Sequence, residues 1–328
     1  MNRRWRLTVF LLLAVPLCLG FALFFGSVDI TWSEFWRAVS GQQGGVTATL
    51  ILELRWPRAL AAFAVGGMLA LAGALLQVLL RNPLADPYIL GISGGAAVAA
   101  LISILLGLGS AWISGSAFLG ALVSMFLVFS LSRTGGGWTQ SRLLLTGVVI
   151  AAGWGALISL ILAVTPGTQL QGMLFWLLGD LGQAQQFGFG LTVLTAGLVL
   201  SLWLARSLNL LARGETVAAA LGERPVRLRI LVYFIASLLT ATAVTLAGSV
   251  GFVGLIIPHI LRLLGLADHR FLLPNAVLLG GSFLVVADTL ARSLFAPIQL
   301  PVGVLTALLG VPVFLYLLSR TISLPGTR

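Results

Sequence analysis

The sequence predicts an all-α polytopic membrane protein of about ten transmembrane helices, folded as a single domain over residues 1–328. Hydrophobic residues make up 59% of the chain and charged residues only 9%, whereas a soluble domain carries about a quarter of its residues as charged side chains. Apolar runs of about 20 residues, the length that crosses a bilayer, recur along the chain. Such a chain cannot cover a water-facing surface, so we expect it to lie in lipid.

Nine apolar runs are long enough to span a bilayer, and polar connections separate them. The first run follows MNRRWR and is too long for the core of a usual signal peptide, so we expect an uncleaved helix. The nine runs lie near residues 7–26, 58–80, 88–108, 111–131, 142–164, 187–206, 228–248, 272–295 and 302–319.

A tenth, shorter apolar stretch covers residues 252–266 and cannot span a bilayer alone. Three glycines, Gly248, Gly251 and Gly254, separate it from the seventh run. We expect a Gly-rich turn there, followed by a half-length helix from about Pro258. Because non-helical backbone at membrane depth is tolerated only when buried in protein or lining a cavity, this turn is a candidate part of an internal pathway.

The arginines predict which side of the membrane each connection faces. Cytoplasmic connections carry an excess of basic residues, and with ten helices both termini share one side. Both termini are therefore predicted to be cytoplasmic. Fifteen arginines fall in one set of connections, namely Arg3, Arg4, Arg6, Arg81, Arg133, Arg142, Arg206, Arg213, Arg224, Arg227, Arg229, Arg262, Arg270, Arg320 and Arg328, and four fall in the other, namely Arg37, Arg55, Arg58 and Arg292.

Small residues recur at a spacing of four within several runs, which lets helices approach closely in lipid. Tight packing within the chain is the favoured interpretation, and a subunit interface is the alternative. The pairs include Gly66 with Ala70, Ala70 with Ala74, Gly91 with Gly95, and Gly303 with Ala307.

Several long segments in a fixed order carry a family resemblance. They are RWPRALAAFAVGGMLALAGALLQVLLRNPLADPYILGISGGAA, SRLLLTGVVI, LAGSVGFVGLIIPHILRLLGLADHRFLLPNAVLLGGSFLVVADTLAR and QLPVGVLTALLGVPVFLYLL. Together these segments resemble the permease subunits of the bacterial ABC importers for iron chelates and cobalamin. The likeness covers most of residues 53–318.

The resemblance implies a permease in the bacterial inner membrane that moves a large metal chelate, such as a ferric siderophore, haem or cobalamin, into the cytoplasm. The implied partners are a second copy or a related permease, two cytoplasmic ATPase subunits and a substrate-binding protein outside. ATP and Mg would bind to the ATPase subunits, and no cofactor to this chain. No residue of the sequence selects one chelate.

The connection at about residues 209–225 is predicted to form a short cytoplasmic helix. Its apolar turn is closed by Gly222, and glycine is a common C-terminal cap. The resemblance implies that this is the coupling helix, which receives motion from the ATPase; an ordinary charged loop is the alternative. The residues assigned to coupling are Arg213, Glu215, Val217, Ala218, Ala219, Leu221 and Gly222.

Arg55, Arg58 and Arg292 lie at the outer ends of helices, against the positive-inside trend. The resemblance implies that they dock acidic residues of the binding protein. Snorkelling of the side chains to the membrane interface is the alternative. For Arg292 a pair with Asp288, four residues earlier on the same helix face, is equally favoured.

The loop RNPLADP is expected to form an extended turn in which Asn82 and Asp86 satisfy free backbone groups. The resemblance suggests that Asn82 and Leu84, with Gln140 and Ser141, narrow the pathway near the cytoplasm. Gln140 stands where relatives often carry a small hydroxyl residue. A plain turn without a gating role is the alternative.

Little in the sequence supplies catalytic chemistry. The chain has no lysine, so it cannot form the GxxxxGK[ST] loop that binds nucleotide phosphates. Its two histidines, His259 and His269, and its one cysteine, Cys18, are too few for a usual metal site. We therefore expect a transport subunit that is no enzyme, binds no metal and does not bind nucleic acid, since its arginines form no basic face.

The main alternative is a secondary transporter driven by an ion gradient, which normally carries ionisable residues in mid-membrane. The nine acidic residues here lie almost entirely in loops or at helix ends. Asp288 is the deepest, and Arg292 lies near it. A membrane-embedded enzyme is a third, weaker alternative.

Overall fold

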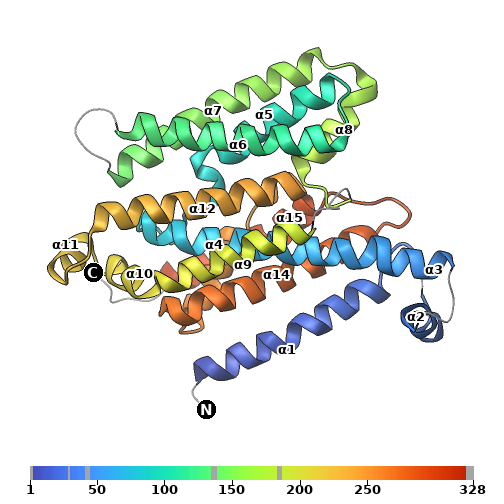
Figure 1. The fold of residues 1–328 in the computed structure, drawn as a ribbon, viewed down its shortest axis with the longest axis horizontal. Helices are drawn as coiled ribbons and strands as arrows, with labels where there is room; N and C mark the ends of the chain where they lie inside the picture. The colour runs from blue at the N-terminus through green and yellow to red at the C-terminus, as the bar shows by residue number, and fades with distance from the viewer. Residues whose placement is uncertain (1–2, 29, 41–44, 134–138, 183–186, 323–328) are drawn as a thin grey trace.

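The computed structural model describes residues 3–28, 30–40, 45–133, 139–182 and 187–322. All regular secondary structure in these ranges is helical. The long helices run side by side, with α5, α6 and α7 stacked on one side of α4, α9, α12 and α14, and with α1 at the opposite edge (Figure 1). The predicted all-α polytopic fold is confirmed at this level.

The helices follow one another with short connections. Their bounds are α1 Arg3–Phe24, α2 Trp32–Val39, α3 Val46–Thr49, η1 Leu50–Arg55, α4 Trp56–Leu79, η2 Pro87–Leu90, α5 Ile92–Leu105, α6 Ser110–Arg133, α7 Gln140–Val164, α8 Gly167–Leu178, α9 Phe187–Trp203, α10 Ala205–Ala212, α11 Glu215–Ala220, α12 Pro225–Ala247, α13 Val253–Leu263, α14 His269–Ser293 and α15 Val302–Ile322.

The helices differ in how completely they could cross a membrane. Within the described ranges, six are long and apolar enough to span, and α9 with α10 forms one further span bent by 62°. Three shorter apolar helices, α5, α13 and the described part of α15, account for the remaining predicted segments. The chain is therefore a multi-pass membrane protein, while the figure of ten complete crossings stays a prediction.

Helix α4 forms the centre of the core, because small residues let its neighbours approach the backbone. A Cβ atom built on Gly66 would lie 2.2 Å from the carbonyl oxygen of Gly280 in α14, and one on Gly73 would lie 1.9 Å from that of Gly254 in α13. One on Gly95 would lie 2.5 Å from the carbonyl of Gly120. These small residues pack helices within the chain, as the favoured interpretation predicts.

The second span begins earlier than the predicted residue 58. Helices α3, η1 and α4 run on without a break from Val46 to Leu79. The turn η1 is a π-helix, in which the N–H of Trp56 bonds the carbonyl of Ile51, five residues back. Pro57 follows directly. The wider turn accommodates the proline, which has no N–H to donate.

The half-length helix also begins earlier than predicted. The expected start at about Pro258 is wrong, since α13 starts at Val253 and Pro258 lies inside it. Proline in a helix leaves the carbonyl four residues back without its usual partner, here that of Gly254. The side-chain amide of Gln77 in α4 donates to this carbonyl at 3.3 Å. The bond from Gln77 therefore lets Pro258 lie inside α13, although a proline in the sequence is more typical of a helix start.

Candidate functional site

Helix α11 lies at one end of the molecule and ends in a Schellman cap. The N–H of Gly222 donates to the carbonyl of Ala219 at 3.0 Å, and that of Glu223 to the carbonyl of Ala218 at 3.0 Å. Gly222 adopts a left-handed φ of 88°, which glycine accepts readily. The predicted short helix with a glycine cap is therefore present.

Two helices hold α11 in place through one carboxylate. Arg229 of α12 donates to Glu215 at 2.7 Å. The side-chain amide of Gln140, the first residue of α7, approaches the same Glu215 oxygen at 3.5 Å. A residue predicted to belong to the gate thus contacts the predicted coupling helix. Ser141 is exposed in the first turn of α7.

The residues predicted to take part in coupling divide into an inward and an outward group. Ala218 is fully buried against the bundle. Val217, Ala219 and Leu221 are exposed, and the Leu221 side chain is 61% accessible. Arg213 is also exposed, in the turn between α10 and α11. The outward group forms a small apolar surface with a basic neighbour.

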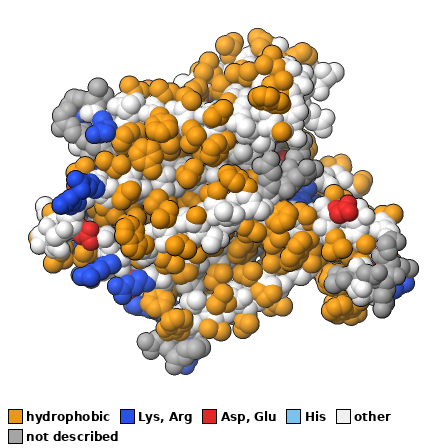
Figure 2. Space-filling view, viewed as in Figure 1, with side chains coloured by type: hydrophobic (Ala, Val, Ile, Leu, Met, Phe, Trp, Pro, Cys, Tyr) orange, Lys and Arg blue, Asp and Glu red, His pale blue; other side chains and the backbone are white. Residues whose placement is uncertain are grey.

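Most arginines gather at the same end of the molecule as α11. Figure 2 shows the blue side chains visible on this face concentrated beside α10 and α11, while hydrophobic side chains cover the length of the helices. The gathering of arginines at one end fits their uneven division between the two sets of connections in the sequence. Arg328 lies outside the described residues, and the sidedness itself stays a prediction.

The loop between α4 and η2 has the predicted hydrogen bonds. The Asn82 side chain accepts from the N–H of Leu84 at 2.9 Å, and Asp86 accepts from the N–H of Tyr88 at 2.8 Å as the cap of η2. The Leu84 side chain is exposed. The turn is therefore ordered by its own side chains, and a gating role for it stays a prediction.

The loop before α5 and the Gly-rich turn after α12 meet inside the molecule. The N–H of Val250 donates to the hydroxyl of Tyr88 at 3.0 Å. A Cβ atom on Gly254 would lie 2.6 Å from a ring carbon of Pro87. Gly251 lies between these two contacts along the chain. Two interruptions of the helical structure that are far apart in sequence are thus packed together.

The Gly-rich turn also holds the ends of two further helices. The N–H of Asp180, just after α8, donates to the carbonyl of Ala247 at 2.9 Å, and the N–H of Val302 donates to the carbonyl of Gly179 at 3.0 Å. Gly248 has a φ of 64°, and a Cβ there would lie 2.2 Å from the carbonyl oxygen of Trp176. Only glycine fits so close an approach.

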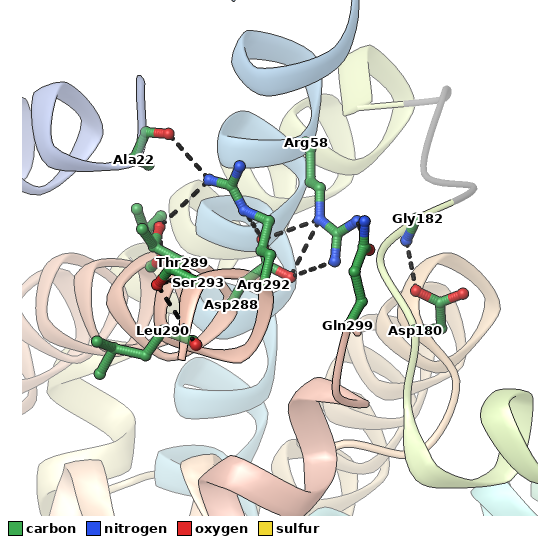
Figure 3. A network of polar contacts seen from close by, with 11 residues as sticks. Ala22, Arg58, Asp180, Gly182, Asp288, Thr289, Leu290, Arg292, Ser293 and Gln299 are labelled. Carbon is green, nitrogen blue, oxygen red and sulfur yellow. Dashed lines mark hydrogen bonds and ion pairs between the residues drawn. The ribbon is translucent and has the colours of Figure 1, made fainter. Parts of the chain in front are cut away.

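Arg58, Arg292 and Asp288 form a buried charge network between α4 and α14 (Figure 3). Arg58 donates to both carboxylate oxygens of Asp288, with a shortest distance of 2.8 Å. Arg292 lies 3.4 Å from the same carboxylate and donates to the carbonyl of Ala22 at 2.9 Å. The predicted pair of Asp288 with Arg292 is present, and Arg58 shares it.

Arg55 is also turned inward. Its guanidinium donates to the carbonyls of Leu23 at 2.7 Å, Phe24 at 2.9 Å and Val28 at 2.5 Å, and its side chain is buried. In this chain the three arginines assigned to docking thus join α1, α4 and α14. Docking of a binding protein by these residues stays a prediction.

His269 lies in a hydrogen-bonded cluster at the start of α14. His269 contacts the side-chain oxygen of Asn209 through its backbone N–H at 3.0 Å and its ring Nδ1 at 2.6 Å. Asn209 in turn donates to Asp268 at 2.7 Å, which caps α14. Asn209 thus joins α10 to the start of α14. Across the described ranges, no group of three His, Cys, Asp or Glu side chains could hold a metal.

A cavity of about 640 Å³ opens between α6, α8 and α12. Ser114 of α6, Phe175 and Trp176 of α8 and Thr245 of α12 line it, with Asp180 at its edge. Residues 183–186, which follow Asp180 in the connection to α9, lie outside the described residues.

Gln77 and Tyr88, which were not among the predicted site residues, connect the interrupted helices. Gln77 donates to the carbonyls of Gly254 and Leu255 and accepts from Arg262. A polar residue inside an apolar run is unusual in a membrane, so Gln77, near the end of the 58–80 run, could have been singled out. Tyr88 carries no comparable signal, because its partner is a backbone N–H 162 positions away.

Comparisons with known proteins match almost the whole chain to one kind of protein. The model of the FecCD transport family matches residues 11–320. The haemin transport system permease HmuU of Yersinia pestis is 39% identical, covering 97% of this chain and 96% of its own. The vitamin B12 import system permease BtuC of Serratia proteamaculans is 39% identical, covering 98% and 95%.

A solved structure agrees as well. It is described as an inward-facing conformation of a transporter provisionally assigned to the metal-chelate type of ABC transporter. It has a TM-score of 0.84 and 32% sequence identity, covering 97% of this chain and 99% of its own. The family match, the permease relatives and this structural likeness lead to one conclusion: the chain belongs to the FecCD transport family of ABC transporter permeases.

Proposed function

We propose that this chain is the membrane-spanning permease subunit of a binding-protein-dependent ABC importer that moves a large metal chelate into the cytoplasm. The energy comes from ATP hydrolysis on a separate subunit. The observation that carries the proposal is the match to haemin and vitamin B12 permeases at 39% identity over at least 97% of the chain, α11 included.

The substrate class follows from what these relatives are named for. Haemin and vitamin B12 both hold a metal ion in a large organic ring, and the similar solved structure is assigned to the metal-chelate type. A ferric siderophore belongs to the same chemical class. We therefore infer a chelated metal, carried whole, as the substrate.

The proposed assembly is a dimer of permeases with two ATPase subunits at the arginine-rich end and a binding protein at the other. Helix α7 supports a dimer, because only Leu143 and Gly147 of its 25 residues are buried within one chain. Its exposed surface is available to a second copy or to lipid. The arginine-rich end would face the cytoplasm, in a bacterial inner membrane.

Motion would enter the permease through α11. An ATPase groove would receive the exposed apolar side chains of Val217, Ala219 and Leu221. Glu215 supports a route onward, because it contacts both Arg229 of α12 and Gln140 of α7. A displacement of α11 would thus act on the inner ends of two spans, close to the proposed gate residues Asn82, Leu84, Gln140 and Ser141.

The deepest acidic residue gives no support to an ion-driven mechanism. Proton or sodium coupling uses intramembrane carboxylates that can exchange their cation. The carboxylate of Asp288 lies between two arginines at 2.8 and 3.4 Å. Such a carboxylate is already paired with two permanent cations of the chain itself, which favours a structural role.

Uptake by reconstituted vesicles tests the proposal. The permease, its partner ATPase and its binding protein are placed in proteoliposomes, and haem, cobalamin and a ferric siderophore are offered in separate arms. We expect accumulation of at least one chelate with hydrolysable ATP and none with a non-hydrolysable analogue. Accumulation driven by a proton or sodium gradient without ATP would contradict the proposal.

A further inference from the structure

Helix α2 is an amphipathic helix that the proposed transport cycle does not use. It lies at the end of the molecule opposite α11 (Figure 1). The Thr31 hydroxyl accepts from the N–H of Glu34 at 3.4 Å, and the N–H of Thr31 donates to the Glu34 carboxylate at 2.9 Å. This capping box fixes the first turn. The Thr31 hydroxyl also donates to the Glu34 carboxylate at 2.7 Å. This bond and the one from the Thr31 N–H hold the pKa of Glu34 below its usual range.

One part of the apolar surface of α2 is buried and fixes the helix to the bundle. Ala38 and the partly buried Phe35 pack with Leu23 of α1 and Ile51 of η1. A helix of eight residues is not stable alone in water. Contact with the ends of two spans therefore holds α2 in a defined position.

The neighbouring part of that apolar surface is uncovered. Trp32 and Trp36 are 64% and 51% exposed. Their ring centroids lie 5.6 Å apart, in an edge-to-face arrangement. Ser33 and Arg37, about 100° around the helix from Trp32 and Trp36 respectively, are also exposed. Two large aromatic side chains thus stand beside a polar face on a short, firmly held helix.

The exposed tryptophans continue the apolar surface of α1. Leu13 and Leu17 on α1 and Phe25 just after its end are exposed at a helical spacing, and most side chains of α1 are not buried within the chain. The ring of Phe24 stacks on that of Trp32, with centroids 5.2 Å apart and planes at 15°. A surface that faces lipid along α1 therefore extends onto α2 without a break.

The direction of α2 differs from that of the spans. In Figure 1 the spans run across the picture, whereas α2 is seen nearly end-on, so its axis lies across the span direction. A helix that lies across the spans at the end of α1 lies along the plane of the membrane surface.

We propose that α2 is an interfacial anchor that inserts Trp32 and Trp36 into the headgroup region of the leaflet opposite α11. Tryptophan concentrates at membrane interfaces because its ring is apolar and its N–H can be hydrated. Amphipathic helices lie in this plane with the apolar face toward the acyl chains. The polar face, with Ser33 and Arg37, points to water. The anchor fixes the end of α1 and goes beyond the transport function.

Spin-label accessibility in bilayers tests the anchor on the intact protein. The lone cysteine is removed by Cys18→Ala, and a nitroxide is attached at Trp36→Cys or, as the matched control, at Ser33→Cys. The full assembly with its ATPase is placed in phosphatidylethanolamine–phosphatidylglycerol vesicles. We expect the label at position 36 to collide more with oxygen than with a water-soluble nickel complex, and the label at position 33 to show the reverse.

Two results would overturn the anchor. Equal nickel accessibility at positions 36 and 33 in vesicles would mean that the aromatic face lies in water. Protection of position 36 that appears only after the soluble binding protein is added would assign this surface to that protein. Thermal unfolding of each labelled variant, unchanged from the Cys18→Ala parent, verifies that the label has not disturbed the fold.

Discussion

At the scale of single residues, Asp288 connects the helix ends opposite α11. Its carboxylate neutralises one of the two guanidinium groups that it contacts, so the buried group of three carries a net positive charge. Arg292 also donates to the carbonyl of Ala22 in α1. Three helices therefore depend on one acidic side chain that is almost fully buried.

Removing this carboxylate should destabilise the protein more than removing either arginine. Asp288→Asn leaves two buried cations without a counter-charge, and breaking a buried pair in this way costs about 3–5 kcal/mol. Arg58→Met leaves the Asp288–Arg292 pair intact and should cost clearly less. Unfolding of the purified permease in detergent measures both. An equal loss in the two variants would contradict the shared network.

Single residues also mark the limit of prediction from sequence. The pair of Asp288 with Arg292 was predictable, because the two lie four residues apart on one helix. The contact of Arg58 with Asp288 joins residues 230 positions apart, and no local spacing indicates it. Gln77 is similar, since its partners lie on α13. Contacts between distant helices require the packing itself.

At the scale of elements, close approach between α4 and α13 depends on two glycines. Gly73 meets the carbonyl of Gly254, and this contact places α13 where Gln77 can reach it. The sequence indicated the short helix and its Gly-rich turn. Its start was mispredicted, because Pro258 is a strong local signal while the compensating amide of Gln77 comes from another helix.

A single methyl group should separate these two helices. In Gly73→Ala the new Cβ would lie 1.9 Å from the Gly254 oxygen, and overpacking of this kind costs about 1–3 kcal/mol or more. The matched control is Gly115→Ala in α6, where the new Cβ would have no atom within 4 Å. This control should stabilise α6 by about 0.5–1 kcal/mol, because alanine favours a helix more than glycine does. Unfolding in detergent measures both. Equal stability of the two variants would contradict the packing.

At the scale of the whole molecule, charge separates the two ends of the bundle. The arginine-rich end carries α11, and the opposite end carries α2. The Asp288 network reaches Ala22 near the end of α1, the helix that precedes α2. The fold class, the order of the spans and the short Gly-capped helix α11 were predictable because they depend on local composition and spacing. The meeting of the RNPLADP loop with the Gly-rich turn was not, because it joins segments more than 160 residues apart.

Cysteine labelling of intact cells should distinguish the two ends. In a Cys18→Ala background, Ser33→Cys on α2 should react with a membrane-impermeant maleimide added outside. Arg270→Cys, exposed at the start of α14, should react only after the cells are opened. The positive-inside rule predicts this pattern. The reverse pattern would show that the arginine-rich end faces outward.

The central claim, that α11 receives the motion of an ATPase, is tested most directly by the number of chelates imported per ATP hydrolysed. The change is Leu221→Asp, with Leu221→Met as the matched control. A carboxylate is costly to bury in an apolar groove, whereas methionine keeps the volume and character of leucine. Because Leu221 is 61% exposed in the chain, neither change should unfold the permease.

We expect Leu221→Asp to lower the ratio about tenfold, which corresponds to ~1.4 kcal/mol of lost contact, while Leu221→Met stays near the parent. Both variants are compared with the parent in the same proteoliposomes, after equal assembly yields have been measured. An unchanged ratio of chelate imported to ATP hydrolysed in Leu221→Asp would contradict the account.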